Sequence, residues 1–415
     1  MKRTDLSHVS DPAPRAARPS GPGAVLRAVL DHGPVARSTV ARLTGLSPAS
    51  VTGHSARLIG AGLLREAPET TGPRGLGRPH VPVEIGDRGP LTAGAHIGVE
   101  RTTLSLMDLR GRVVAAQPLP HAPGAARDPV RTLDRLCATL PAFLDRHTAG
   151  RPVAALGVAT GHRVDPASGT VVDHPLLGWR DVPVRKRLGA ATGLPVRVDS
   201  HARALARAEQ LFGAPTVRRA ARASAVLLFV GAVVDAAFTT GGVVHEGPRA
   251  GAGGVAHLPV GGERGEAPAP CACGALGCLT AEVSERATLA RAAATGLPAP
   301  SFRALLDAAL AGEPRARRIF ERRAVLAGRA AALLLDMFDP AVLVVVEPGA
   351  GRLPHCLAAL RSSAARHSRS LGRVDTESTV VPSSFTGEVL ATAGGAVALH
   401  ALYSDPLGQF PLPRT

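Results

Sequence analysis

The chain has 415 residues, 45% of them hydrophobic and 20% charged, which is typical of globular proteins and too long for one hydrophobic core. Its net charge of +15 at pH 7 suits a phosphate-rich partner, although the same arginine bias also follows from a GC-rich genome. The basic N-terminus precedes no apolar run, and the apolar stretches 331–338 and 341–346 are too short to span a bilayer. We therefore expect a cytoplasmic, nucleoid-associated protein of several domains, with no membrane partner.

Residues 21–86 follow a segment, residues 1–20, that we expect to be a disordered tail, and they begin with two predicted helices. Apolar residues at helical spacing predict an amphipathic helix over 22–30. After the His-Gly-Pro break, Ser38 is predicted to be the N-cap of a second, short helix.

A third helix is predicted to begin after Ser47, because serine can cap it and the following Pro48 lacks an N–H group that would be left unpaired. Small polar residues in its first turns would let this helix lie deep in the major groove of DNA. We expect DNA contacts in this region from Arg37, Ser47, Ala49, Ser50, Thr52, His54 and Arg57.

Short strands predicted at 63–66 and 81–85 flank a glycine-rich loop and would complete a winged helix-turn-helix. Arg74 and Arg78 lie in this loop, and an arginine in a flexible loop suits the enhanced negative potential of a narrow minor groove. The alternative is a small helical packing domain with a solvated basic loop. The agreement of turn, cap and wing in chain order favours DNA binding.

From about residue 90 the pattern changes to strands followed by helices, twice over, which predicts two α/β lobes with a cleft between them. The first lobe, residues 90–210, has predicted strands at 93–99, 103–109, 111–119 and 154–160 and a helix at 126–148. The second lobe, residues 211–410, has predicted strands at 224–231, 236–242, 243–247 and 341–347 and helices at 315–338, 352–367 and 386–402. We expect the final helix to pack back on the first lobe.

Five segments carry a family resemblance. They are RSTVARLTGLSPASVTGHSARLIGAGLLRE with a later GRP, VDPASGTVVDHPLLGWRDVPV, LPVRVDSHARALARAE, GPRAGAGGVAHLPV and CACGALGCL. Together they resemble the ROK family (repressors, open reading frames and kinases) over nearly the whole chain, and the winged helix points to its regulators. The resemblance implies an α/β, two-lobed, actin-like or ribonuclease-H-like ATPase fold that assembles as a homodimer or homotetramer.

The segment CACGALGC holds three of the five cysteines, Cys271, Cys273 and Cys278. With His257 they supply three thiolates and one imidazole, which fit tetrahedral zinc and leave no open position for a catalytic water. The resemblance assigns a structural zinc to the same four positions. The alternatives are an unmetallated loop and a redox pair, although Cys-x-Cys lacks the usual redox spacing. Cys137 and Cys356 fall in predicted helices, where we expect small core residues.

The cleft departs from the pattern of the family's kinases. Ser200 and His201 stand where the resemblance places an Asn-Asp pair, whose Asp acts as general base toward a sugar hydroxyl. The turn GAVVD at 231–235 replaces a phosphate-binding Gly-Thr-Gly, and His96 replaces the Asp of the first phosphate loop. Because phosphate and magnesium contacts are missing as well as the base, we expect no kinase activity.

Sugar-binding positions are also altered. Gly254 and Thr280 stand where the resemblance places two sugar-contacting glutamates, with Glu282 close by. A hexose is held by fixed polar partners, so we expect weakened or lost sugar binding. If a sugar or other small-molecule effector binds this degenerate cleft, the candidate residues are Ser200, His201, Gly254, His257 and Glu282.

The sequence thus predicts a DNA-binding transcriptional repressor that contacts a double-stranded operator. Its enzymatically inactive body would serve for oligomerisation and is a candidate sensor of an effector. Two alternatives differ in class: a sugar kinase fused to a winged helix, and a constitutive DNA binder without a ligand.

Overall fold

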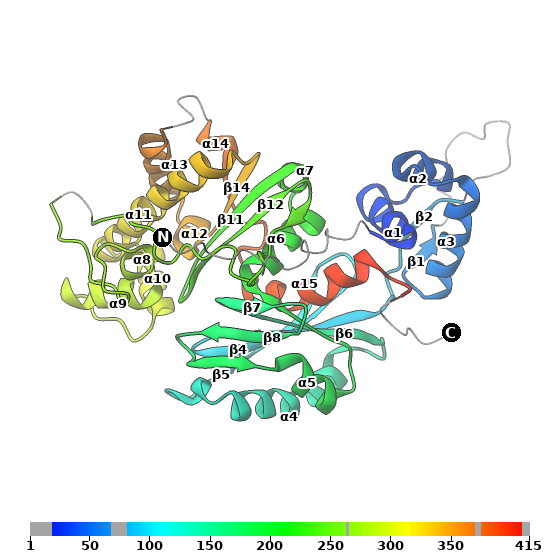
Figure 1. The fold of residues 1–415 in the computed structure, drawn as a ribbon, viewed down its shortest axis with the longest axis horizontal. Coiled ribbons are helices and arrows are strands. Elements are labelled where there is room, and N and C mark those ends of the chain that lie inside the picture. Colours follow the sequence, from blue (N-terminus) through cyan, green and yellow to red (C-terminus); the bar gives the residue numbers. More distant parts are fainter. Residues whose placement is uncertain (1–18, 68–80, 263–264, 370–374, 409–415) are drawn as a thin grey trace, which may run out of the picture.

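The computed structural model describes residues 19–67, 81–262, 265–369 and 375–408. Figure 1 shows a small helical domain beside two larger lobes, each built on a β-sheet. Within the described residues, no helix combines the length and the apolar character needed to cross a membrane. The architecture is the predicted α/β one, with three helices and a two-stranded ribbon ahead of a two-lobed body.

The N-terminal domain packs three helices against a two-stranded antiparallel ribbon. Its elements are α1 (Gly21–His32), α2 (Arg37–Thr44), α3 (Pro48–Gly60), β1 (Leu64–Glu66) and β2 (Val83–Ile85). The Oγ of Ser47 accepts a hydrogen bond from the N–H of Ser50 at 3.1 Å, which confirms the predicted cap of the third helix. The predicted cap of the second helix is wrong. Val35 pairs with Val83 of the ribbon, so the extended chain ends there and α2 begins at Arg37, before Ser38.

The first lobe is a five-stranded mixed sheet with helices on its outer face. The strand order is β10-β6-β3-β4-β5, in which β10, β6 and β3 are parallel and β3, β4 and β5 are antiparallel. The strands are β3 (Leu91–Ile97), β4 (Arg101–Met107), β5 (Val113–Pro120), β6 (Val153–Thr160) and β10 (Val196–Ser200). The covering elements are α4 (Pro129–His147), α5 (Val184–Thr192) and a small sheet of β7 (Arg163–Asp165), β8 (Thr170–His174) and β9 (Trp179–Val182).

The second lobe repeats this plan with the strand order β13-β12-β11-β14-β15. Its strands are β11 (Ser224–Val230), β12 (Val234–Thr240), β13 (Val243–Val244), β14 (Val342–Val346) and β15 (Val380–Pro382). Its helices are α8 (Leu279–Val283), α9 (Glu285–Ala294), α10 (Phe302–Leu310), α11 (Pro314–Phe338), α12 (Pro348–Arg352), α13 (Pro354–His367) and α14 (Thr376–Thr379). Cys356 on α13 is fully buried as expected, and Cys137 on α4 is partly buried and packs against the core of the first lobe.

Three further helices connect the parts of the molecule. α6 (His201–Phe212) and α7 (Pro215–Ala223) lead from the first sheet to the second, and α15 (Val389–Ser404) returns from the second lobe to lie on β3, β4 and β6 of the first. The backbones of α15 and β3 are in direct contact, because a Cβ added to Gly94 would lie 2.3 Å from the backbone nitrogen of Gly395. Only glycine permits this approach.

The helix-turn-helix shares a hydrophobic core with the body. Figure 1 shows the red end of α15 against the blue α1. The apolar face of α1, with Val25 and Val29, belongs to the same buried cluster as Leu402 and Tyr403 at the end of α15. The Tyr403 hydroxyl donates to the carbonyl of Leu109 at 2.5 Å, which ties that end to the first lobe. The N-terminal domain is therefore packed on the body.

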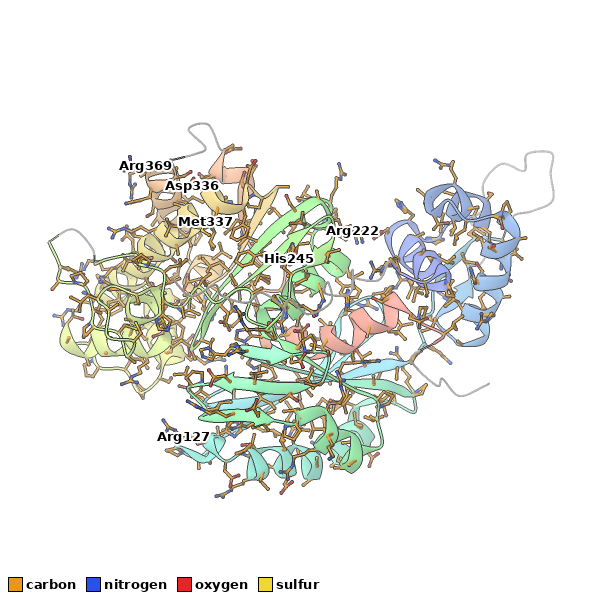
Figure 2. All side chains as sticks on the ribbon, in the orientation of Figure 1. Arg127, Arg222, His245, Asp336, Met337 and Arg369 are labelled. Carbon is orange, nitrogen blue, oxygen red and sulfur yellow. The ribbon has the colours of Figure 1, made fainter. Side chains whose placement is uncertain are left out.

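An ion pair adds a second attachment between α1 and the body. Asp31 of α1 accepts hydrogen bonds from both terminal nitrogens of Arg222 on α7, at 2.6 and 3.0 Å. Arg218, one turn earlier on α7, lies 3.7 Å from the same carboxylate. Figure 2 shows Arg222 on the side of the body that faces α1. Such bidentate geometry fixes orientation as well as distance.

Candidate DNA-binding surface, metal centre and interlobe cleft

The outer face of α3 is exposed and carries small or polar side chains. Its inner face buries Val51, Ser55 and Leu58 in the domain core. The exposed residues of its N-terminal half and its last turn include Ser47, Ala49, Ser50, Thr52 and Arg57 from the predicted set. The Thr52 hydroxyl donates to the carbonyl of Pro48 at 2.9 Å and keeps its acceptor lone pairs outward.

Two predicted contacts, Arg37 and His54, have partners inside the domain. The guanidinium of Arg37 forms an ion pair with Glu66 of β1 at 2.8 Å and also donates to the carbonyl of Val81. His54 is half-buried, with its ring against Gly21 at the start of α1. Both side chains would have to leave these partners to bind DNA. Arg74 and Arg78 lie outside the described residues.

The four predicted metal ligands come together at one point. Their ligand atoms all lie within 4.8 Å of one another, with His257 Nδ1 3.5 Å from Cys271 Sγ and Cys273 Sγ 3.6 Å from Cys278 Sγ. Tetrahedral zinc with Zn–S bonds of about 2.3 Å requires sulfurs about 3.8 Å apart, so the donor set and its spacing fit zinc. Positive φ angles at Gly274 and Gly277 make the tight loop possible.

Glu282 is hydrogen-bonded to the chain that leads into the metal-binding loop. This predicted effector residue is buried, and its carboxylate accepts the N–H of Ala269 at 2.7 Å and pairs with Arg322 at 2.8 Å. Each oxygen of the carboxylate thus has a partner, and Glu282 anchors the chain that leads into Cys271. Its role as an effector contact stays a prediction.

A buried histidine network, consisting of His96, His162, His174, His201 and Asp235, fills the cleft where the two lobes meet. His201 Nδ1 lies 3.3 Å from His96 Nε2, and His201 Nε2 lies 3.4 Å from an Asp235 oxygen. The same Asp235 oxygen accepts the backbone N–H of His162 at 2.8 Å, and the ring of His162 packs edge-on against His174. The network joins β12 of one lobe to the first lobe.

The predicted effector residues Ser200 and His201 are also buried, at 5% and 2% exposure. The Ser200 Oγ caps α6 by accepting the N–H of Arg203 at 3.3 Å, and the His201 ring stacks on Phe229. Both side chains therefore have partners inside the protein, and their role as ligand contacts stays a prediction. Gly254 and His257, by contrast, are exposed.

The turn that replaces a phosphate loop also closes the gap between the lobes. A Cβ added to Gly161, at the end of β6, would lie 2.8 Å from a methyl group of Val233. Val233 is 6% exposed and therefore occupies the space beside the first lobe. The turn therefore places a valine side chain against Gly161.

Burial lowers the pKa of two histidines of the network, His96 and His174. Desolvation is the largest cause that lowers the pKa of His96 well below 6.5, and the facing His201 adds to the effect. Desolvation also lowers the pKa of His174 to about 3, with a further contribution from His162. Hydrogen bonding and the charge of His201 lower the pKa of Asp235 despite its burial.

These shifts predict a loss of stability in weak acid. His96 and His174 take up protons near pH 6.5 in the unfolded chain but not in the folded one. The free energy of unfolding is therefore highest above pH 6.5 and decreases as the pH drops below that value. Between pH 7.5 and 5.5 the expected loss is about 1.4 kcal/mol for each histidine. Denaturant unfolding at pH 7.5 and 5.5 measures this loss. His174→Asn should reduce the dependence of the unfolding free energy on pH, and His245→Asn, at an exposed histidine, is the control. An unchanged slope in His174→Asn would contradict it.

The comparisons with known proteins agree with this geometry. A model of the ROK family matches residues 92–400. The chain is 36% identical over 406 residues to a transcriptional regulator of Mycobacterium tuberculosis, covering 94% of this chain and 87% of that protein. It is 26% identical over 336 residues to the DNA-binding transcriptional dual regulator NagC of Escherichia coli, covering 78% and 79%.

Solved structures give the same fold. A crystal structure of a ROK family transcriptional regulator, described as a homologue of the E. coli MLC protein, superposes with a TM-score of 0.72 at 24% identity over 92% of this chain and 96% of that one. A ROK family glucokinase from Streptomyces griseus superposes with a TM-score of 0.60 at 24% identity over 74% and 98%. With this family model matched over residues 92–400, the chain belongs to the ROK family.

Proposed function

We propose that this protein is a DNA-binding transcriptional regulator, and specifically a repressor. The observation that carries the proposal is the exposed, small-residue face of α3 beside the β1–β2 ribbon, in a chain similar over 94% of its length to a transcriptional regulator. In the complex, α3 enters the major groove, with Ala49, Ser50 and Thr52 at base edges and Arg57 on a phosphate.

Two copies of the chain present two winged helices to two half-sites of an operator. The shared core of α1 and α15 supports this proposal, because it holds the DNA-binding domain in a fixed orientation on the body. Exposed apolar side chains at the end of α11, Leu333, Met337 and Phe338, are the proposed contact between copies. Light scattering on the full chain tests the assembly, and a monomer at micromolar concentration would contradict it.

The experiment that tests the regulator is genome-wide mapping of bound DNA in the source cells, followed by titration of the recovered fragments with the purified chain. Affinity for these fragments should exceed that for unrelated DNA by at least about 1,000-fold at physiological salt. It should also fall steeply as salt rises, because phosphate contacts release counterions. Equal affinity for recovered and unrelated fragments would refute a sequence-specific regulator.

The body is proposed to be catalytically inactive. His201 is sealed between His96, Asp235 and Phe229, where the kinases of the family place a base that must reach the sugar. Val233 fills the space beside Gly161 that a phosphate would need. Phosphoryl transfer depends on positioned phosphates and a metal as well as a base, so the losses compound.

We accordingly expect no ATP turnover in a coupled assay over a panel of hexoses and N-acetylhexosamines. Loss of the base alone typically costs on the order of 10²–10⁴-fold in rate. His201→Asp should not rescue activity, because Val233 would still occupy the phosphate space. Turnover by the unmodified chain above a no-enzyme control would favour the competing proposal of a sugar kinase joined to a winged helix.

The metal centre is proposed to hold one structural zinc ion through His257, Cys271, Cys273 and Cys278. A closed set of four protein ligands supports a structural role, since a catalytic zinc keeps an open position. The site joins the loop after Gly254 to the start of α8 and so stabilises the wall of the second lobe. It takes no part in a reaction.

A further inference from the structure

A hollow remains between the lobes, on the other side of the buried histidine network. This cavity, called the interlobe cavity below, has a volume of about 530 Å³, within the range of sites for drug-sized ligands. One wall comes from β4 and β5 of the first lobe, and the other from the ends of β11 and β14 with α9, α10 and α12 of the second. Its floor is the segment from Thr386 into the first turn of α15.

The walls of the interlobe cavity are mainly apolar. Phe229, Phe302, Leu306, Val345 and Leu390 contribute rings and branched chains from four different elements. Its uncharged hydroxyl groups belong to Thr103, Ser383 and Thr386, and Ser383 Oγ already donates to Glu209 at 2.8 Å. A hexose would leave most of its hydroxyls without partners here, which disfavours a sugar. Flat or extended apolar groups fit such walls.

Charged groups also line the interlobe cavity. Arg101 on β4 and Arg352 on α12 are exposed, and neither guanidinium is hydrogen-bonded or ion-paired within the described part of the chain. Arg303 adds a third cation, 3.7 Å from the exposed Asp307, and Glu388 is the one carboxylate at this rim among the described lining residues. Glu347 also lines the cavity but is held by Arg323.

Glu285, the first residue of α9, is a carboxyl group of the wall. It is half-buried, its carboxylate has no hydrogen bond or ion pair within the described residues, and desolvation raises its pKa. A half-buried carboxyl of this kind is stabilised by a hydrogen-bonding partner. A ligand that carries both a hydroxyl or N–H group and an anionic group would satisfy Glu285 and the arginines together.

We propose that the interlobe cavity binds an amphipathic organic anion, with its aromatic or acyl body between the lobes, its anionic group at Arg101 and Arg352, and a hydrogen-bond donor at Glu285. This inference deepens the proposed function, on which it rests, by naming the class of effector. A nucleoside triphosphate is disfavoured because Val233 fills the phosphate space beside Gly161.

The position of α15 gives the ligand a route to the DNA-binding domain. Leu390 in the first turn of this helix lines the cavity, and Tyr403 in its last turn packs with α1. The helix has 16 residues, which corresponds to about 24 Å at 1.5 Å per residue. A ligand that moves the first turn therefore moves the surface on which α1 rests.

The test uses 8-anilinonaphthalene-1-sulfonate, an aromatic sulfonate with one N–H group, as a fluorescent probe of the full chain. We expect saturable binding of one probe per chain, displaced by 3-(4-hydroxyphenyl)propionate. Ala116→Trp, which places a large ring in the cavity from the exposed wall of β5, should abolish binding. The double variant Arg101→Ala with Arg352→Ala should weaken it by roughly tenfold or more. Arg146→Ala, an exposed arginine on α4, is the control and should bind as the unmodified chain does.

Unchanged probe binding in Ala116→Trp would overturn the proposal, and displacement by glucose or by MgATP would replace it with a sugar or nucleotide site. The hydroxyaryl acid should also change DNA affinity in the unmodified chain but not in Ala116→Trp; no change in either would overturn the route through α15. A chain that binds the probe as described but no specific DNA would refute the proposed function while leaving the cavity assignment supported.

Discussion

Thr52→Glu is expected to abolish specific DNA binding while leaving the fold intact. Thr52 is exposed on the outer face of α3, and its hydroxyl hydrogen-bonds to the carbonyl of Pro48 in the same helix. A carboxylate there would be repelled by the phosphates of the groove, and it could not donate a hydrogen bond to the acceptor atoms of the bases. Loss of one or two base contacts with added repulsion predicts at least about a 100-fold weaker affinity. Fluorescence anisotropy on mapped fragments measures it.

The matched control is Thr139→Glu on α4. Thr139 also lies on a helix surface, and its hydroxyl likewise donates to the carbonyl four residues earlier. This variant should bind DNA as the unmodified chain does. Arg57→Ala should instead weaken binding evenly across sequences and reduce the salt slope by about one. Full affinity in Thr52→Glu would show that α3 is not the recognition helix.

Cys278→Ser is expected to remove zinc and to destabilise the second lobe. Cys278 is 3% exposed and directly precedes α8, so its sulfur is the ligand closest to the core. The purified chain should contain about one zinc ion, as a closed four-ligand site requires. Losing one thiolate should eliminate bound metal and lower the melting temperature by several degrees, because binding energy of a structural metal contributes to folding.

Cys137→Ser is the control for this substitution, since Cys137 lies on α4, away from the metal ligands. It should keep both the zinc content and the melting temperature. Metal analysis and calorimetry on the two variants make the comparison. A zinc-free purified chain whose melting is also insensitive to chelator would refute the metal assignment.

Local patterns predicted the winged helix and the metal loop well. The Ser47-Pro48 start of α3 and the spacing of Cys271, Cys273 and Cys278 act over a few residues, so the sequence itself carries their geometry. The cap of α2 was missed because Val35 pairs with Val83, a contact across many residues of intervening chain. Long-range pairing overrides local propensity at such positions.

The cleft could not be predicted in the same way. Its histidines come from β3, β8, α6 and the segment after β6. These elements and Asp235 are far apart in the sequence, so no local pattern shows that they meet. Ser200 and His201 were expected to face a ligand because their positions do so in the family's kinases. Phe229 and Asp235 close over His201 here, and the sequence holds no local sign of that closure. A position that lines the cleft in the family's kinases is therefore not necessarily accessible to a ligand in this protein.

The packing of α1 on the end of α15 has a consequence for building chimaeric regulators. Many DNA-binding domains can be exchanged between proteins because a linker is all that joins them to the rest of the chain. Here Val25 and Val29 complete a core whose other half is encoded near the opposite terminus, at Leu402 and Tyr403, and Asp31 needs Arg222. A graft that changes operator specificity should therefore replace only the outer face of α3, or else transplant the matching end of α15 and α7 along with the domain.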